Sequence, residues 1–370
     1  MPETRIIDSL GEVGRDQWAA LFPGELEDYD YLLAVERSGL EGFRWRYLLV
    51  IEGDRLLAAG VAFITEYPLE TTLGGAGRRL AASLRRVFPD ALTLRLACLG
   101  SPCTEKALYG FAPQATPGER QALLRALLAG LEDLARRERC GLLGVKDVLA
   151  ADRPLWDAVG VPRGYRAIPS LPIAGLRVDF ADLDSYLARL TPSARKDMRR
   201  KLRAREQVRI EIRDNVDDQI DRIMALYAET RARADMAFED LTPAYFQGVL
   251  GGMPGRAFCV LYFQGDDLLA INLMLAGRDT LLDKFFCMDA ERGRPFNLYF
   301  LSWFTNVGLC IERGLGHYQA GQAAYRNKLR LGSELTRTAN YFRHRNVLVN
   351  GALKLVAPLL AADPTLRDAA

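Results

Sequence analysis

The residues that could carry chemistry gather in one stretch of the chain, from Arg256 to Gly332. Asp283 lies inside the apolar run from Thr280 to Cys287, and burial in such a strand would raise the pKa of its carboxyl group. A raised pKa makes Asp283 a candidate general base, with His317 as a weaker candidate for the same role. The alternative for Asp283 is a structural ion pair with Lys284 or an arginine.

Histidine and cysteine usage argues against several other kinds of site. Only two histidines occur, His317 and His344, which disfavours a Ser-His-Asp hydrolase and a His-rich metal site. The six cysteines form no Cys-x-x-Cys pair and have no histidine at ligand spacing. Neither a zinc site nor a disulfide framework is therefore indicated, and we expect chemistry without a metal.

Three short strands, a loop, a long helix and a further strand must position the candidate residues. The strands are expected at residues 257–263, 268–276 and 280–287. Turn-forming runs separate them, so they predict an antiparallel meander. Residues 297–313 have apolar side chains at near-helical spacing, and Gly314 follows at the position where glycine ends helices.

The same order of elements occurs earlier in the chain. The run Gly53-Asp-Arg-Leu-Leu-Ala58 is repeated 212 residues later as Gly265-Asp-Asp-Leu-Leu-Ala270. Each copy lies between two expected strands and precedes a third strand, a helix ended by glycine, and a fourth strand. The pattern predicts an α/β fold of two related domains, 1–178 and 179–370, each a mostly antiparallel mixed sheet flanked by helices. The alternative is one large mixed-sheet domain.

Charge is balanced over the whole chain, because 49 basic residues face 47 acidic ones. No window of about 18 apolar residues occurs, and the N-terminus lacks the charged and apolar regions of a signal peptide. We therefore expect no membrane span and a cytoplasmic protein.

Basic residues concentrate in one predicted helix, Arg195 to Arg205, where seven of the residues from Ala194 onward are basic and one is acidic. Thr191 and Pro192 are suited to begin this helix, and Met198 and Leu202 would face the core. Its basic side chains could contact the phosphates of a tRNA. The alternative is a surface helix or domain brace, since aromatic residues for base stacking are missing.

Three segments add to the order of elements. They are Leu190–Arg203, Pro295–Trp303 with the Ile311–Gly314 run after it, and Ala320–Gly332 with Tyr325-x-x-Lys328 inside it. The meander, loop, helix and strand resemble the GNAT acyltransferase fold. A tandem pair with these segments resembles the FemAB-like and BioF2-like acyltransferases within that fold.

The resemblance implies a slot between two strands that splay apart, in which the arm of a thioester such as acyl-CoA lies. The pyrophosphate of the donor would meet the N-terminus of the following helix. The cofactor contacts implied in this chain are Arg292, Gly293, Arg294, Asn297, Gly321 and Gln322. The alternative for the two arginines is a solvated turn. The acetyl-CoA signature Arg/Gln-x-x-Gly-x-Gly/Ala is not intact, which leaves other acyl donors open.

The resemblance also implies roles for two residues near the end of the stretch. Lys328 stands where FemAB-like enzymes have a lysine before a Phe-Gly pair, although Leu331-Gly332 replaces that pair here. Its ammonium could stabilise an oxyanion, and the phenol of Tyr325 could protonate a leaving thiolate. The alternatives are an ion pair between Lys328 and Glu334 and a core-packing role for Tyr325.

These features together predict an N-acyltransferase that moves an acyl group from a thioester donor to an amine of a small molecule or peptide. One alternative keeps the fold and uses aminoacyl-tRNA as the donor, as the FemAB-like resemblance implies. Another is a binding module of the same fold that has lost its chemistry.

Overall fold

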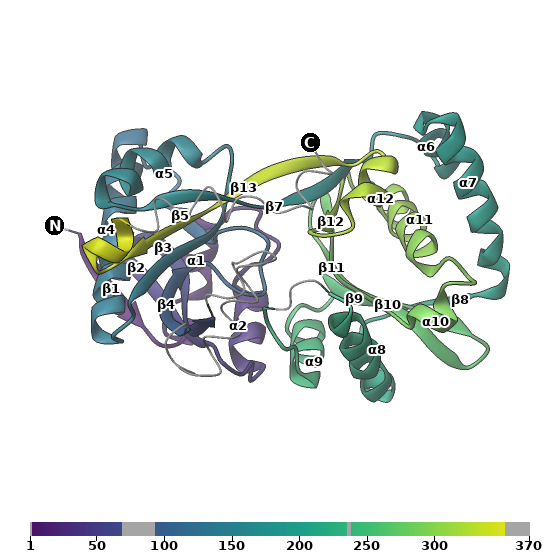
Figure 1. The fold of residues 1–370 in the computed structure, drawn as a ribbon, viewed down its shortest axis with the longest axis horizontal. Helices are drawn as coiled ribbons and strands as arrows, with labels where there is room; N and C mark the ends of the chain where they lie inside the picture. Colours follow the sequence, from purple (N-terminus) through teal and green to yellow (C-terminus); the bar gives the residue numbers. More distant parts are fainter. Residues whose placement is uncertain (1, 69–92, 235–237, 352–370) are drawn as a thin grey trace. The chain divides into compact units, whose positions relative to one another are not determined.

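The chain forms two compact units in the computed structural model, which describes residues 2–68, 93–234 and 238–351. The first unit comprises Met1–Pro23, Glu41–Pro172 and Thr336–Ala370, and the second comprises Gly24–Leu40 and Ile173–Leu335. The predicted tandem of mixed-sheet units is confirmed by this architecture (Figure 1). No helix in the described ranges combines the length and the apolarity that a membrane crossing requires.

The first unit is a mixed sheet packed against a long helix. Its strands run in the order β1-β2-β3-β4-β6-β13, and β5 pairs with β3. Its strands are β1 (Glu3–Ile7), β2 (Arg44–Glu52), β3 (Arg55–Pro68), β4 (Thr93–Leu99), β5 (Tyr109–Phe111), β6 (Leu142–Leu149) and β13 (Glu334–His344), and its helices include α1 (Arg15–Leu21), α4 (Pro117–Arg137) and α5 (Arg153–Gly160). Leucines of α4 pack on the sheet and form its core.

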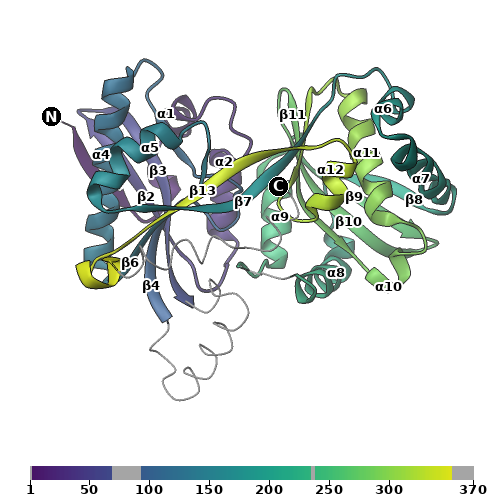
Figure 2. The same ribbon diagram turned by 45° about the horizontal axis from the view of Figure 1, so that its top comes forward.

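The second unit is a mixed sheet in the order β7-β12-β11-β10-β9-β8. Its strands are β7 (Arg166–Arg177), β8 (Arg209–Arg213), β9 (Ala257–Gln264), β10 (Asp267–Ala276), β11 (Thr280–Met288) and β12 (His317–Gly321), and its helices are α2 (Tyr29–Arg37), α6 (Leu183–Arg189), α7 (Pro192–Leu202), α8 (Ile220–Ala232), α9 (Pro243–Gly252), α10 (Ala290–Gly293), α11 (Leu298–Glu312) and α12 (Tyr325–Arg330). Helices α8 and α9 lie on one face of this sheet and α11 on the other (Figure 1 and Figure 2). The predicted meander is β9, β10 and β11, and the predicted long helix is α11.

Local sequence signals explain where several elements begin and turn. Helices α4, α7 and α9 each start with a Thr-Pro pair, and the threonine oxygen accepts a hydrogen bond from the backbone N–H three residues later. The repeated Gly-Asp pairs form the two-residue turns of the β2–β3 and β9–β10 hairpins. Gly53 and Gly265 both have a φ of +59°, a conformation that glycine adopts without steric cost.

The observed division of the chain differs from a single boundary at residue 178. Strands β7 and β13 each begin in one unit and continue into the other, and residues 24–40 belong to the second unit although they lie early in the sequence. Long-range contacts cause this difference. Helix α2 packs against α9, and the Tyr31 hydroxyl lies 2.8 Å from that of Tyr245.

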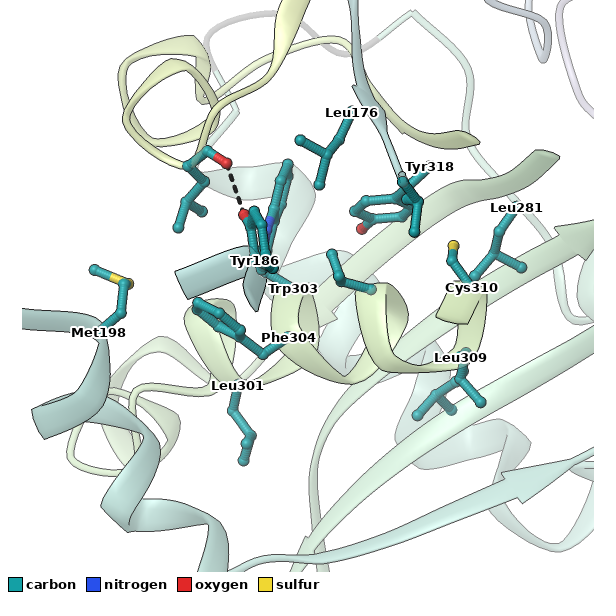
Figure 3. Packing of buried hydrophobic residues seen from close by; sticks show 14 of the residues in the cluster. Leu176, Tyr186, Met198, Leu281, Leu301, Trp303, Phe304, Leu309, Cys310 and Tyr318 are labelled. Atoms are coloured by element: carbon teal, nitrogen blue, oxygen red, sulfur yellow. Dashed lines mark hydrogen bonds between the residues drawn. The ribbon is translucent and has the colours of Figure 1, made fainter. Parts of the chain in front are cut away.

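The core of the second unit contains a buried hydrogen-bonded link between three segments (Figure 3). The hydroxyl of Tyr186 on α6 donates to the carbonyl oxygen of Leu331 at 2.6 Å and accepts from Nε1 of Trp303 on α11 at 2.8 Å. Tyr186 and Trp303 are both buried. The link therefore holds the turn after α12 to α6 and α11.

We expect Tyr186→Phe to lower the free energy of unfolding by about 2–3 kcal/mol, because it leaves a buried N–H and a buried carbonyl without their partner. Urea-induced unfolding measures the change. Tyr165→Phe is the matched control, since the Tyr165 hydroxyl is buried without a hydrogen-bond partner in the described structure. Equal losses for the two variants would contradict a stabilising role for the Tyr186 link.

Candidate active site

The strands β11 and β12 stop pairing while both continue. Their parallel register joins Thr280 to His317, Leu281 to Tyr318 and Leu282 to Gln319. Beyond Leu282, β11 runs on to Met288, paired on its other side with β10, and β12 runs on to Gly321, paired on its other side with β7. We call the point after the Leu282–Gln319 pair the fork. Two strands that part in this way leave backbone groups facing each other without ladder bonds.

Lys328 lies at the β12 side of the fork. Its ammonium donates to the carbonyl oxygens of Ala320 at 2.5 Å and Gly321 at 3.0 Å, the first residues of β12 beyond the last pair. The side chain is buried, so its positive charge acts in a medium of low polarity. The backbone therefore holds a buried cation at the end of β12.

The loop between β12 and α12 has a strained backbone. Gly321, Ala323 and Ala324 have φ values of +75°, +84° and +52°, and only the first is glycine. Non-glycine residues in this region cost on the order of 1 kcal/mol each, and such strain is common at functional sites. Tyr325, the first residue of α12, is buried directly after this loop, and Gln322 within it is half-buried.

Asp283 is the first residue of β11 beyond the fork. Its Oδ2 accepts hydrogen bonds from Asn272 Nδ2 at 2.8 Å, Asn306 Nδ2 at 3.3 Å and the Tyr318 hydroxyl at 3.0 Å. These donors come from β10, α11 and β12. Asp283 and the ammonium of Lys328 thus flank the fork from its two strands.

A β-bulge changes which face each neighbour of Asp283 occupies. In the register with β10, Asp283 pairs with Met274 and Phe285 with Leu273, so Lys284 is an extra residue on β11. The Lys284 ammonium forms an ion pair with Glu27, and both side chains are buried. The alternative of an Asp283–Lys284 pair stays a prediction.

The loop from β11 to α11 is held by the cap of α10 and by ion pairs to α8 and β10. Asp289 caps α10 and also bonds Arg222; burial pushes its pKa up, but the N–H of Arg292 and the guanidinium of Arg222 bring the pKa below its usual value. The guanidinium of Arg292 is paired with Asp267 on β10. Arg294 is exposed beside it.

Two small residues shape the start of α11. Gly293 lies so close to Leu298 that an added Cβ would meet a Leu298 methyl carbon at 2.9 Å. Asn297 precedes the helix with a φ of +53°, a conformation that asparagine tolerates better than most residues. The first N–H groups of a helix lack partners within it, so this end of α11 can attract an anion.

The structure places His317 away from the fork. It pairs with Thr280 at the opposite end of the shared register, and its Nδ1 lies 2.8 Å from Asp279 at the surface. Hydrogen bonds from the Gly316 N–H and His317 lower the pKa of Asp279. This surface contact with Asp279 is sufficient to explain the position of the His317 side chain.

The predicted basic helix is observed as α7 and the short 3₁₀ turn Arg203–Gln207 after it. Met198 is fully buried, as expected. Arg195 donates to the carbonyl oxygens of Leu187, Ala188 and Leu190 and so caps the end of α6. At least one of the basic side chains therefore has a structural role.

The corresponding strands of the first unit end differently. β4 and β6 pair from Leu96–Leu142 to Leu99–Val145, and the loop after β4 is then bonded to the end of β6. The Lys146 ammonium donates to the Thr104 carbonyl oxygen at 2.6 Å, and the Ala107 N–H donates to the Asp147 carbonyl oxygen at 2.9 Å. The fork with its buried lysine is thus a feature of the second unit.

Sequence patterns did not identify Asn272, Asn306 and Tyr318. A signal existed, because both asparagines interrupt strongly apolar runs, and a polar residue in such a run is informative. The Glu27–Lys284 pair had no comparable signal, since 257 residues separate its members.

Comparisons with known proteins agree with this architecture. The FemAB-like family model, described as peptidoglycan biosynthesis/recognition, matches residues 174–355. The structure is similar to that of FemX, with 13% identity, 96% of this chain and 100% of that chain covered, and a TM-score of 0.60. No curated protein sequence matches the chain significantly.

Two further solved structures share the fold. A tandem GNAT protein from the clavulanic acid biosynthesis pathway is 14% identical over 92% of this chain and 98% of that one, with a TM-score of 0.53. L-PGS from Bacillus licheniformis is 11% identical over 92% and 98%, with a TM-score of 0.50. At these identities the similarity concerns the fold.

Proposed function

We propose that the protein is an acyltransferase that moves an acyl group from a thioester donor to an amine, on the premise of the match of residues 174–355 to the FemAB-like family model and of the tandem GNAT-like fold. The observation that carries the proposal is the fork, with the buried Lys328 ammonium on one side and the Asp283 carboxylate on the other. An acyl group placed there would meet a cation and a proton acceptor together.

Lys328 would stabilise negative charge that develops on the acyl oxygen. Two of the three ammonium donors bind the carbonyls of Ala320 and Gly321, which keeps the charge in one place. A preorganised charge in a buried site needs little reorganisation during the reaction, and this is the main source of such stabilisation.

Proton transfer would use groups on both sides of the fork. Asp283 would accept the proton of the attacking amine, because its carboxylate lies partly buried beside the parted strands. Tyr325, at the start of α12, would protonate the leaving thiolate. His317 is a weaker candidate for the base, since it lies at the far end of the register.

The donor in this proposal is an acyl-CoA or a similar thioester. The parted backbones suit an extended arm, and the N-terminus of α11, with Arg294 and Asn297, suits the anionic end. Gln322, in the loop after β12, would be a further contact of the donor. Arg292 contributes less, because Asp267 already pairs with it. The acceptor would be an amine of a small molecule or peptide, and the family description favours a peptide.

Aminoacyl-tRNA is the second candidate donor. The resemblance to FemAB-like enzymes implies this donor, and the basic helix α7 would contact the tRNA. The third candidate, a binding module without chemistry, keeps the fork but predicts no turnover.

Thermal unfolding with a panel of donors tests the proposal. Acetyl-CoA, longer acyl-CoAs and charged tRNA are compared, with free CoA and uncharged tRNA as controls. A ligand at 100 times its dissociation constant raises the unfolding free energy by about 2.7 kcal/mol, so a true donor shifts the midpoint measurably. A shift with charged tRNA alone would replace the thioester by the second candidate, and no shift with any donor would contradict both.

A further inference from the structure

We propose that Asn272, Asn306 and Tyr318 are positioning residues that hold one oxygen of Asp283, so that the carboxylate exchanges its proton at the other oxygen. The inference rests on the proposed function, because it assigns the second oxygen of Asp283 to the amine. It concerns a group of side chains that meet only in the folded chain.

The three donors approach Asp283 from three directions. Asn272 on β10, Asn306 on α11 and Tyr318 on β12 all donate to the same atom, Oδ2, at 2.8, 3.3 and 3.0 Å. Asn306 Nδ2 also donates to the Tyr318 hydroxyl at 2.9 Å, which orients that hydroxyl toward the carboxylate. The network therefore determines the rotation of the carboxylate as well as its location.

A carboxylate oxygen has about two lone pairs for hydrogen bonding. Three donors saturate Oδ2, so a proton that Asp283 accepts has to bind Oδ1. The network therefore determines the direction of proton transfer, because its hydrogen bonds prevent the aspartate side chain from rotating.

The burial of the donors argues that the network has a purpose beyond packing. Asn272 and Asn306 have no exposed surface, and the Oδ1 atom of each lacks a hydrogen-bond partner in the described structure. Burying an amide is unfavourable unless its polar atoms are bonded, and a leucine would fill the same space without that cost. Both asparagines direct their donor ends to Asp283 despite this cost.

The other titratable groups around Asp283 stay neutral where a carboxylate titrates. They are Tyr262 on β9, Cys287 on β11, Tyr299 on α11 and Tyr318 on β12. Burial raises the pKa of each; it brings that of Cys287 to about 12, and the charge of Asp283 adds to the effect. A carboxyl titration seen in this cluster therefore belongs to Asp283.

The experiment follows the Asp283 carboxyl in the full-length chain by its carbon-13 NMR shift, with Asp283→Asn to assign the signal. Tyr318→Phe and Asn306→Leu each remove donors to the ionised form, and a hydrogen bond to a charged group corresponds to about a tenfold factor. We expect the midpoint of the Asp283 titration to rise by about one pH unit in each variant. Tyr165→Phe, which removes a buried hydroxyl in the first unit, should leave the midpoint unchanged.

Activity measurements then distinguish the positioning role of the three residues from the assignment of Asp283 as the base. Thiol release from an acyl-CoA in the presence of an amine panel is measured against pH, and the acidic limb of the profile should move with the NMR midpoint. Unchanged midpoints, with lower thermal stability alone, would overturn the positioning role and leave the proposed function standing. Full activity in Asp283→Asn would overturn the assignment of the base, whatever the midpoints show. Tyr318→Phe, which loses only one oxygen, keeps the test decisive if Asn306→Leu does not fold.

Discussion

Lys328→Met lowers the rate of acyl transfer by about 10²–10³-fold while the chain stays folded, which is the effect of losing one preorganised oxyanion donor. Methionine has nearly the length of lysine and no charge, so it fills the same buried space. The carbonyls of Ala320 and Gly321 lose their donor as well, which lowers the unfolding free energy by about 1–3 kcal/mol. Single-turnover kinetics with the donor that shifts the melting midpoint measures the rate.

Two companion variants test the charge at position 328 and the proposed proton donor Tyr325. Lys328→Arg keeps the charge but changes its shape, so it should keep the fold and recover only part of the rate. Tyr325→Phe removes the group proposed to protonate the thiolate. It should lower the transfer rate most for acyl donors whose thiol is a poor leaving group. If Lys328→Met transferred acyl groups at the normal rate, the assignment of the oxyanion site would be wrong although the fold would be unaffected.

Glu27→Met destabilises the protein by about 3–5 kcal/mol, because it leaves the Lys284 ammonium buried without its counter-ion. The exposed fractions of the two side chains are 2% for Glu27 and 3% for Lys284, so water cannot replace the lost partner. The Tyr31 ring, 5.3 Å from the ammonium, offers only a weaker cation–π contact. Urea unfolding of the full chain measures the loss.

The double variant Glu27→Met/Lys284→Met is the critical comparison. Replacing both members of a buried pair by apolar residues is often neutral, so the double variant should regain most of the stability lost in either single variant. Asp133→Asn, in an exposed pair with Arg136 on α4, serves as a control and should change the unfolding free energy by less than about 1 kcal/mol. A loss in the double variant equal to the sum of the singles would show that the pair is not coupled.

The Glu27–Lys284 pair also bears on how the domain is defined. The FemAB-like match begins at residue 174, whereas the compact unit that contains the fork includes residues 24–40. Arg256 forms ion pairs with Asp28 and Asp30 in that early segment. These ion pairs, together with the Glu27–Lys284 pair, join the segment to the rest of the unit. The matched region therefore lacks part of the compact unit that contains the fork, and it extends beyond that unit at its C-terminal end.

Local patterns in the sequence were sufficient to determine most of the elements. Short apolar runs bounded by turn-forming residues predicted the hairpins. The Thr191-Pro192 pair marked the beginning of α7, and Gly314 the end of α11, where its φ is +65°. The run that recurs at an offset of 212 residues predicted the tandem architecture, because the same order of elements follows each copy.

The candidate site depended more on tertiary structure. The sequence singled out Asp283, and the family resemblance pointed to Lys328 and implied that two strands part. Neither could say that both residues flank the point of parting. Asn272, Asn306 and Tyr318 lie on three elements, and only folding brings them to one oxygen atom. The bulge at Lys284 directs that residue to Glu27 across 257 positions of sequence. Short-range propensities determine elements, whereas bulges, ion pairs and buried networks arise from packing between distant segments, for which a single sequence carries no local signal.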